Sequence, residues 1–557
     1  MALTSIIRQE CPTCHKIALE QSRIKLGKTV IVKLACGHIL HFQTLESDVS
    51  TYDSIVFSDG CKPRPYQIDA VKFAENSDVR CIIADEQGLG KTIESLSLLR
   101  LHPEKLLPAV IVCPTTVKLQ WMREIHRICG NGPEFLTQVI QTGKEKAMPG
   151  FKVYIITYDM LKKEDLFQFL PEGTIKTLII DECQRIKNHL SDRAKAIQKV
   201  GKVTPHIVPM SGTPIKNNAG EYFTVLNLVA PTRFPSYQAY LDRYCDTYEA
   251  GWNVKVGGLK DADRFHEDTK DIIIRRTKKE VLKDLPSIDR KFYHVELDKK
   301  LNKAYAAALE ELDELLYSDE SEFQKGSATI AIMSKLRHIT GISKVEECVD
   351  FVSEFLLSSE DVDIPQFKKE IINTNGISVT HHIEDGVKRQ GRKIVIFTHH
   401  QDVMGILQAK LDVWCASGDF EPTLAMHSGL DGNQRAALVE KFKDTNSRIM
   451  IASTLAAGEG LNLQFCSDAV ILERQWNPAN EEQAEARFHR FGQQNNVSIT
   501  YMIASGTIDE YFTELVEIKR SIVASTLDNK EIEWNQQSLM KDLAEMLTTK
   551  GRDKWRM

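Results

Sequence analysis

The stretch from Cys81 to Thr92 constrains this chain more than any other. It reads Cys-Ile-Ile-Ala-Asp-Glu-Gln-Gly-Leu-Gly-Lys-Thr, so four small or branched apolar residues precede a glycine-rich turn. The apolar residues predict a buried strand, and residues 93–99 predict a helix after the turn. A glycine-rich turn at a helix N-terminus points backbone N–H groups at an anion, which the helix dipole also favours. The sequence therefore predicts a phosphate-binding loop.

Lys91 and Thr92 give this loop its chemistry. Lys91 can reach the β- and γ-phosphates of a nucleotide, and the Thr92 hydroxyl is placed to bind Mg²⁺. The general pattern requires glycine five residues before Gly90, but Asp85 stands there, so the loop is a variant. A purely structural turn would explain the two glycines but not Lys-Thr after a strand.

Length and composition limit the class of protein. At 557 residues the chain exceeds one hydrophobic core, and 42% hydrophobic with 27% charged residues is ordinary for a soluble globular protein. No apolar run approaches the ~18 residues of a membrane span, and the start lacks a secretory signal. The 12 cysteines are mostly scattered singly, which suits a reducing compartment. We expect an intracellular protein without a membrane partner, cytoplasmic in a bacterium or phage and nuclear in a eukaryote.

Apolar strands alternate with helical stretches over residues 61–218. Such alternation predicts an α/β fold with a doubly wound parallel sheet, whose ligands bind at the carboxyl ends of the strands. A second α/β unit without a phosphate loop is predicted over 391–505. The predicted strands are 81–84, 109–116, 152–158, 177–182 and 206–214, the last interrupted by Pro209, and then 393–400, 424–429, 448–454 and 468–472.

The stretches around these units are predicted to be helical. Residues 219–290 show no strand rhythm and are interpreted as a helical insertion with a linker around Pro286. Residues 291–390 begin the second lobe with another helical insertion, in which helices continue to about residue 385. Residues 506–557 are interpreted as a helical tail.

Two further motifs carry charged residues that suit ATP hydrolysis. Asp181 and Glu182 follow four branched apolar residues, so Asp181 can hold Mg²⁺ and Glu182 can orient and deprotonate the attacking water. Arg487 and Arg490 lie three residues apart, on one face of a predicted helix. Facing a nucleotide across a cleft they would act as arginine fingers on the γ-phosphate. A surface helix with salt bridges remains the alternative for this last motif.

The first 60 residues predict a zinc-ribbon-like module. Cys11 and Cys14 form one knuckle, and Cys36 with His38 forms a second after a β-rich span. Tetrahedral Zn²⁺ takes such sulfur and nitrogen ligands, and so small a module lacks the core to fold without metal. His41 is an alternative fourth ligand to His38, and His15 is a weaker one. Exposed turns with incidental cysteines are the competing interpretation.

The motifs, in this order and spacing, resemble the Swi/Snf family of helicase-like ATPases in helicase superfamily two. The resemblance covers roughly residues 62–530. It rests on Asp85–Thr92, the Asp181-Glu182-Cys183-Gln184 box, 211–218, 453–464, Trp476-Asn477-Pro478 and 487–493. The family implies two RecA-like lobes with ATP between them and double-stranded DNA across their faces, so the chain would divide into 1–60, 61–218, 219–290, 291–390, 391–505 and 506–557. Residues 507–527 resemble its brace helix. Gln184 departs from the usual His and puts the coupling of hydrolysis to DNA in question.

The resemblance also implies roles for individual residues. Gln67 would read adenine, Gly460 would contact nucleotide or DNA through its backbone, and Trp476 would lie on the DNA side. The loop residues that would bind ATP are Asp85, Glu86, Gln87, Gly88, Leu89, Gly90, Lys91 and Thr92. Those that would contact DNA phosphates are Thr115, Lys118, Thr157, Thr398, Ser453 and Thr454.

The compact layout resembles the annealing-helicase and fork-remodelling branch of the family. We therefore expect a monomeric, Mg²⁺-dependent ATPase that translocates on double-stranded DNA and remodels branched DNA in repair, recombination or replication. One alternative is an ATP-driven remodeler of protein–nucleic acid complexes, such as an RNA polymerase recycling factor. Another is a zinc-containing DNA-binding scaffold with a degenerate ATPase, which the intact motif residues disfavour.

The zinc-ribbon interpretation is tested by metal content. Purified chain should hold one Zn²⁺ through Cys11, Cys14, Cys36 and either His38 or His41, because four such ligands complete a tetrahedral site. Elemental analysis before and after chelation measures this. Cys14→Ser should lose the metal and leave ATP binding intact, and metal-free native protein would contradict the assignment.

Overall fold

The structure is a computed structural model. It describes residues 52–163, 165–215, 218–247, 256–315, 328–358, 391–418, 420–454, 462–475, 480–514 and 516. It also gives the backbone of strands and helices within 8–43, 245–259, 316–343, 361–391 and 478–485. None of the helices in this described part is long and apolar enough to cross a bilayer.

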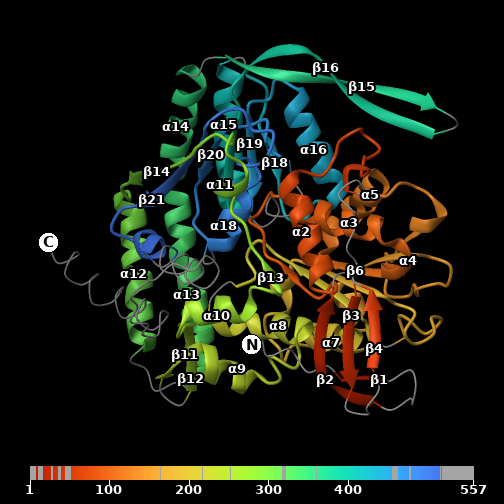
Figure 1. Cartoon of the computed structure of the whole chain (residues 1–557). Coiled ribbons are helices and arrows are strands. Elements are labelled where there is room, and N and C mark those ends of the chain that lie inside the picture. Colours follow the sequence, from red (N-terminus) through yellow and green to blue (C-terminus); the bar gives the residue numbers. More distant parts are fainter. Residues whose placement is uncertain are drawn as a thin grey trace.

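The first lobe is built on a seven-stranded parallel sheet with the order β13-β5-β10-β9-β6-β8-β7. Its strands alternate with helices along the chain, as predicted (Figure 1). The strands are β5 (Ile82–Ile83), β6 (Ala109–Cys113), β7 (Thr137–Val139), β8 (Val153–Thr157), β9 (Thr177–Asp181), β10 (His206–Met210) and β13 (Ile273–Ile274). The helices are α2 (Pro65–Asn76), α3 (Lys91–Leu101), α4 (Pro103–Leu106), α5 (Lys118–Ile128), α6 (Tyr158–Leu161) and α7 (Asp192–Val203).

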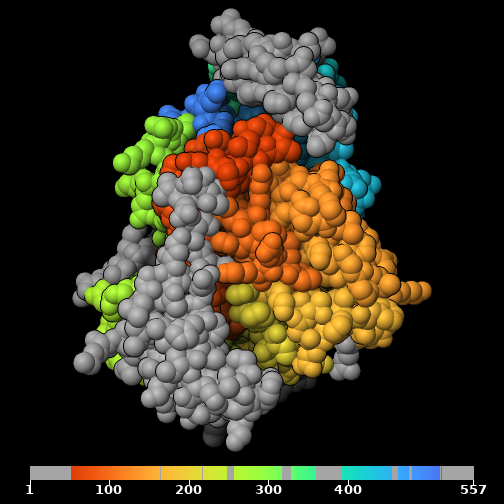
Figure 2. Space-filling view, turned by 45° about the vertical axis from the view of Figure 1, so that its right-hand side comes forward, coloured from red at the N-terminus to blue at the C-terminus, as the bar shows by residue number. Residues whose placement is uncertain are grey.

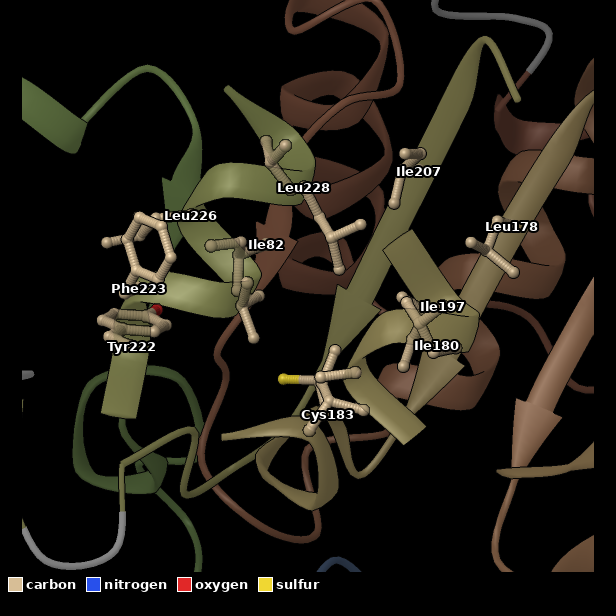
Figure 3. Packing of buried hydrophobic residues seen from close by; sticks show 14 of the residues in the cluster. Ile82, Leu178, Ile180, Cys183, Ile197, Ile207, Tyr222, Phe223, Leu226 and Leu228 are labelled. Carbon is tan, nitrogen blue, oxygen red and sulfur yellow. The ribbon is translucent and has the colours of Figure 1, made fainter. Parts of the chain in front are cut away.

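Both faces of this sheet are buried in hydrophobic cores. Neighbouring residues of each strand point to opposite faces, so they join different cores. Ile180 and Ile82 join the core beneath α7 and α8 (Phe223–Val229), where Figure 3 shows them with Leu226 and Leu228. Ile179 and Ile83 join the other core, which also contains residues of α2, α3 and α5. Strands buried on both faces read as continuous apolar runs, which is why the sequence predicts them.

The second lobe has a six-stranded parallel sheet with the order β14-β21-β20-β17-β19-β18. Its strands are β14 (Ile288–Val295), β17 (Ile394–Thr398), β18 (Leu424–Met426), β19 (Ile449–Ser453), β20 (Asp468–Ile471) and β21 (Val497–Ala504). Its helices are α12 (Lys299–Leu316), α13 (Glu322–Ser343), α14 (Val345–Ser358), α15 (Gln401–Ser417), α16 (Gly432–Asp444) and α18 (Pro478–Glu485). On the face shown in Figure 2, orange residues of the first lobe abut cyan and blue residues of the second.

Several local expectations are wrong. The stretch 219–290 holds α9 (Tyr237–Tyr244), α10 (Ala262–Thr269) and α11 (Lys278–Val281), but also the hairpin β11 (Cys245–Ala250) with β12 (Asn253–Leu259) and the strand β13. The helices expected to continue to about residue 385 give way to the hairpin β15 (Asp361–Thr374) with β16 (Ile377–Gly391). In the two hairpins, antiparallel pairing satisfies the backbone hydrogen-bonding groups.

The strand β10 also runs through Pro209 rather than stopping there. The N–H groups of Ile207 and Ser211 bond to the carbonyls of Val79 and Ile83, so proline removes only the bond between them. The short strand β5 tolerates this gap because its other edge bonds to the segment around β13. Proline therefore weakens one ladder without breaking the sheet.

The N-terminal residues form a four-stranded antiparallel sheet in the order β1 (Arg8–Glu10), β2 (Ile17–Leu26), β3 (Thr29–Leu34) and β4 (Ile39–Gln43). The β-rich span predicted between the two knuckles corresponds to β3. Cys11, Cys14, Cys36 and His38 lie outside the described residues, as do His15 and the His41 side chain, so the zinc site stays a prediction.

A buried ion pair links the helical insertion of the second lobe to the segment after β21. Lys344 Nζ lies 2.5 Å from Asp509 Oδ2, and the two side chains are 0% and 4% exposed. The carboxylate also accepts hydrogen bonds from Thr340 Oγ1 and from the Ala504 N–H. These bonds repay the desolvation of the charges.

Replacing one partner of this pair should destabilise the second lobe. Asp509→Asn leaves the Lys344 ammonium buried without its counter-charge, which should cost about 3–5 kcal/mol in unfolding free energy. Chemical denaturation measures the change. The matched control is Glu311→Gln, whose partner Lys335 lies 2.6 Å away with both side chains about half exposed, and which should cost about 1 kcal/mol or less. Equal effects from both variants would contradict the prediction.

Candidate active site between the lobes

The phosphate loop connects β5 to α3, where the sequence predicts it. Gly88 and Gly90 have φ of 91° and 93°, a left-handed conformation that side chains disfavour. A Cβ on Gly90 would lie 2.4 Å from Gln67 Nε2, so a side chain there would displace the end of Gln67 as well as strain the backbone. Gly90 is the N-cap of α3, and Lys91 is the first residue of that helix.

The Lys91 ammonium lies inside the loop. Its Nζ donates to the Asp85 carbonyl at 2.8 Å and to the Glu86 carbonyl at 3.4 Å. Burial lowers the pKa of Lys91, while the nearby carboxylates, Glu182 first, oppose that shift. The ammonium thus lies among loop carbonyls and acids, and its contact with phosphate stays a prediction.

Asp85, the departure from the general loop pattern, forms a buried ion pair with Arg276. The backbone N–H and the Nε of Arg276 donate to Asp85 Oδ1 at 3.0 and 3.2 Å, and its Nη2 also contacts Oδ2. The same guanidinium lies 3.2 Å from Glu94 Oε1. Burial and the neighbouring Asp85 raise the pKa of Glu94, so its carboxyl favours the neutral form beside this pair.

Asp181 ends β9 and Glu182 follows it, close to the loop. Asp181 Oδ2 accepts a hydrogen bond from Trp121 Nε1 at 2.8 Å, and burial, followed by the charge of Glu182, raises the pKa of Asp181 to about 7. Glu182 has φ of 55°, a strained conformation for a residue with a side chain. The Tyr158 hydroxyl donates to the carbonyls of both acids, at 2.5 and 3.1 Å, and holds the turn in place.

Gln184, which stands where the resemblance expects His, holds the Glu182 side chain. Its Nε2 donates to Glu182 Oε2 at 2.5 Å. Its Oε1, together with Gln87 Nε2 and Thr213 Oγ1, is buried with no hydrogen-bond partner among the described residues. Gln87 and Thr213 lie close together, because Gly212, the residue before Thr213, packs against Gln87. A Cβ on Gly212 would lie 2.8 Å from the Gln87 backbone nitrogen. Unpaired buried polar atoms beside a phosphate loop are expected to need water or a bound ligand.

Arg487 and Arg490 follow α18 in turns, so their placement on one helical face is wrong. The Arg487 and Phe488 N–H groups bond three residues back, to Ala484 and Glu485, and Gly492 has φ of 93°. These tighter bonds end the helix before the arginines. Arg490 nevertheless reaches the first lobe: its Cβ lies 3.3 Å from where a Gly88 Cβ would stand. Burial lowers the pKa of Arg490 against the influence of Glu124.

Two other contacts join the lobes. The Arg64 guanidinium lies 3.4 Å from the centroid of the Phe491 ring, a cation–π contact next to Arg490. A Cβ on Gly432, at the start of α16, would lie 3.1 Å from the Thr116 carbonyl. The arginine segment of the second lobe thus lies against the phosphate loop of the first.

Gln67, the predicted adenine reader, lies beside the loop and is 3% exposed. Its Nε2 donates to the Leu89 carbonyl at 2.9 Å, and its Oε1 accepts from the Arg64 N–H at 2.9 Å. The Tyr66 hydroxyl donates to the same Leu89 carbonyl at 2.8 Å. In this structure both side chains therefore support the loop.

The residues predicted to contact DNA differ in exposure. Thr115 is exposed after β6, but the Lys118 ammonium is turned inward to the Ile140 carbonyl at 3.1 Å. Thr157 Oγ1 accepts the Met160 N–H at the start of α6. Thr398 and Thr454 are buried against each other, with Thr454 Oγ1 donating to the Thr398 carbonyl at 3.2 Å, and Ser453 is 9% exposed. Trp476 and Gly460 lie outside the described residues.

Sequence reasoning did not identify Arg276 or Lys278 at this site. Both follow β13, and the Lys278 N–H donates to Glu86 Oε2 at 2.7 Å. The available signal was the basic run 275–279 directly after the apolar residues 272–274.

Two parallel-sheet lobes, with a phosphate loop and an Asp-Glu pair on one and arginines on the other, define the class of two-lobed helicase-like ATPases. Residues 66–343 match the SNF2-related domain family, and residues 378–492 match the helicase conserved C-terminal domain. The chain belongs to the SNF2 family of helicase-like ATPases.

Comparison with known proteins gives relatives of modest identity. The mouse "DNA annealing helicase and endonuclease ZRANB3" is 27% identical over 84% of this chain and 41% of its own length. The Xenopus laevis "SWI/SNF-related matrix-associated actin-dependent regulator of chromatin subfamily A-like protein 1" is 28% identical over 82% of this chain and 43% of its own length. The chain therefore spans about two fifths of these relatives. The solved structure "Sulfolobus solfataricus SWI2/SNF2 ATPase core in complex with dsDNA" has 21% identity and a TM-score of 0.38, covering 88% of this chain and 96% of that one.

The Asp85–Arg276 pair predicts that restoring the general loop pattern will harm the protein. Asp85→Gly leaves Arg276 without its main partner and should lower the unfolding free energy by about 3 kcal/mol. That is the low end of the cost of breaking a buried pair, because Glu94 remains near. Nucleotide binding should weaken as the loop loses its anchor.

Thermal melting and nucleotide titration measure both effects. The double variant Asp85→Gly with Arg276→Met removes the buried charge as well and should recover part of the stability, as coupled residues do in a double-mutant cycle. A single variant as stable as the wild type would contradict the role of the pair.

Proposed function

We propose that this chain is a DNA-dependent ATPase that translocates on double-stranded DNA and remodels branched DNA. The observation that supports it most is the approach of Arg490 to Gly88, because an arginine of one lobe then lies beside the phosphate loop of the other. The similarity to relatives whose name is "DNA annealing helicase and endonuclease ZRANB3" supports the proposal that the substrate is branched DNA. The processes proposed are DNA repair, recombination or replication, by fork remodelling, branch migration or annealing.

The hydrolysis step follows from the residues of the site. The phosphate-loop N–H groups and Lys91 bind the β- and γ-phosphates, and Gln67 is proposed to meet the adenine. Water attacks the γ-phosphorus, Glu182 accepts its proton, and the bond to the bridging oxygen breaks with its electrons leaving on ADP. Arg487 and Arg490 are proposed to stabilise the charge that spreads over the γ-phosphate oxygens.

Mg²⁺ fits the oxygen groups gathered here. The Thr92 hydroxyl and the Asp181 carboxylate are hard oxygen donors of the kind this ion prefers, and they would hold it beside the loop. Bound there, the ion would neutralise phosphate charge.

The DNA contacts are proposed at the carboxyl ends of the strands. Thr115, Lys118, Thr157, Thr398, Ser453, Thr454 and Trp476 are the proposed contacts, with Gly460 at nucleotide or DNA. Four hydroxyls of this set are buried or already bonded, so the proposal requires the strand ends to open when DNA binds. The module 1–60, with Zn²⁺, is proposed to favour branched DNA ends. The two lobes are proposed at 61–218 and 391–505, and the remaining segments are proposed to be insertions and a brace.

Single substitutions should separate nucleotide binding from hydrolysis. Lys91→Ala should lose phosphate contacts, whereas Glu182→Gln should bind ATP without hydrolysing it. Arg490→Ala should lower kcat by about 10³-fold or more if it acts as an arginine finger. Steady-state turnover with duplex DNA measures these effects, and Lys443→Ala, an exposed charge in α16, serves as the control. Near-normal turnover of the Glu182 or Arg490 variant would refute the assignment.

The DNA dependence of the ATPase tests the substrate. Hydroxyl and backbone contacts to phosphates carry no base information, so stimulation should be largely independent of DNA sequence. It should fall steeply with salt, because cationic side chains that neutralise phosphates, such as Lys118, release counterions. Turnover and branch migration are compared on single-stranded, duplex, forked and four-way DNA, with and without residues 1–50. That deletion should reduce activity on junctions more than on linear duplex, and processive unwinding of long tailed duplexes would contradict the proposal.

A further inference from the structure

The segment from β13 to β14 passes over the phosphate loop on its way from one lobe to the other. It begins as a continuation of the sheet: Ala84 N–H bonds to the Ile274 carbonyl at 2.8 Å, and Glu86 N–H bonds to the Arg276 carbonyl at 2.9 Å. Near its end, the Pro286 carbonyl lies 2.7 Å from His489 Nε2, next to Arg490. We call residues 275–287 the interlobe segment.

Lys278 is the residue of this segment that lies over the loop. Its Cε is 3.5 Å from the position of a Cβ on Gly88, and Arg490 Cβ is 3.3 Å from the same position. Lys278 and Arg490 thus reach the same glycine from two different elements. The charge of Lys278 also contributes, after burial, to lowering the pKa of His489.

The Lys278 ammonium is buried but only loosely paired. Its side chain is 7% exposed, and Nζ lies 3.5 Å from Glu86 Oε1, a carboxylate that is 36% exposed. That distance is at the long end for a hydrogen bond, so this pair only partly repays the cost of burying the charge. Burial lowers the pKa of Lys278, Glu86 and then Glu485 raise it, and the nearby Lys91 adds to the lowering. Lys278 therefore brings a second ammonium to the loop that already encloses Lys91, and Arg490 approaches the same glycine, so an anion with several negative charges would be stabilised there.

We propose that Lys278 is a second phosphate-binding lysine, which contacts the terminal phosphate of a nucleoside triphosphate together with Lys91 and Arg490. This inference rests on the proposed ATPase function and adds a residue to its site. Because Lys278 belongs to the interlobe segment, its contact makes that segment sensitive to the presence of the terminal phosphate. Glu86 holds the ammonium when that phosphate is absent.

The test compares binding of a triphosphate with binding of a diphosphate to the whole chain without DNA. Lys278→Met should weaken a non-hydrolysable ATP analogue about tenfold or more, the size expected for a lost charge-assisted contact, while ADP affinity stays within about twofold. Retained ADP binding also shows that the variant is folded. Lys279→Met is the matched control, since the neighbouring Lys279 is exposed, and it should change neither affinity.

A second variant distinguishes phosphate binding from a structural role of the Lys278–Glu86 pair. Lys278→Arg keeps the positive charge and should keep the preference for the triphosphate. Equal loss of ADP and analogue binding in Lys278→Met, no loss at all, or loss of the triphosphate preference in Lys278→Arg would overturn the inference. If the wild type binds and hydrolyses ATP, and Lys278→Met has the same affinities for the analogue and for ADP, the inference about Lys278 fails while the proposed function stands. Wild-type protein that neither binds nor hydrolyses ATP would overturn the proposed function as well.

Discussion

The buried ion pair between Asp85 and Arg276 holds the active site of this protein together. It joins residues 191 positions apart, at the point where the phosphate loop leaves β5 and the interlobe segment leaves β13. Backbone bonds at 2.7 to 2.9 Å, from Ile82, Ala84 and Glu86 to the opposite segment, fix the register of the two. Because neither charge can be removed alone without leaving the other buried, the loop depends on the chain having closed the whole first lobe.

The strands that the sequence predicts are those whose side chains are buried on both faces of a sheet. Strands such as β6 and β9, covered on both faces, read as apolar runs, and the polar groups that follow them mark the site. The edge strand β14 escaped prediction because most of its residues are exposed, and β13 because it has only two residues. The strand β21 carried a signal in its β-branched and apolar residues that was missed. The sequence predicts that the arginines face the nucleotide, but not that Arg490 approaches Gly88 in particular, because the sequence pattern does not indicate which residue packs against a glycine.

The conformation of Glu182 shows how the site supports a strained residue. A left-handed backbone at a non-glycine position costs on the order of 1–3 kcal/mol, so surrounding bonds must hold it. Tyr158 bonds to the carbonyls of Asp181 and Glu182, and Gln184 bonds to the Glu182 carboxylate. A histidine at position 184 would offer a ring N–H to that carboxylate, and the glutamine amide offers an equivalent donor. In this chain the glutamine therefore supplies the bond that orients the Glu182 carboxylate.

The lobes are connected at the site itself rather than only at its periphery. The interlobe segment is fixed to the first lobe by Arg276 and to the second by the contact of Pro286 with His489. His489 is followed directly by Arg490, against Gly88, and by Phe491, against Arg64. A rotation of the second lobe must therefore change the distance from Arg490 to the phosphate loop. A charge-assisted contact weakens steeply with distance and angle, so in the proposed mechanism a small rotation would be enough to form or break the contact of Arg490 with phosphate. The proposed function would thus couple movement of the lobes to the nucleotide through a few adjacent residues.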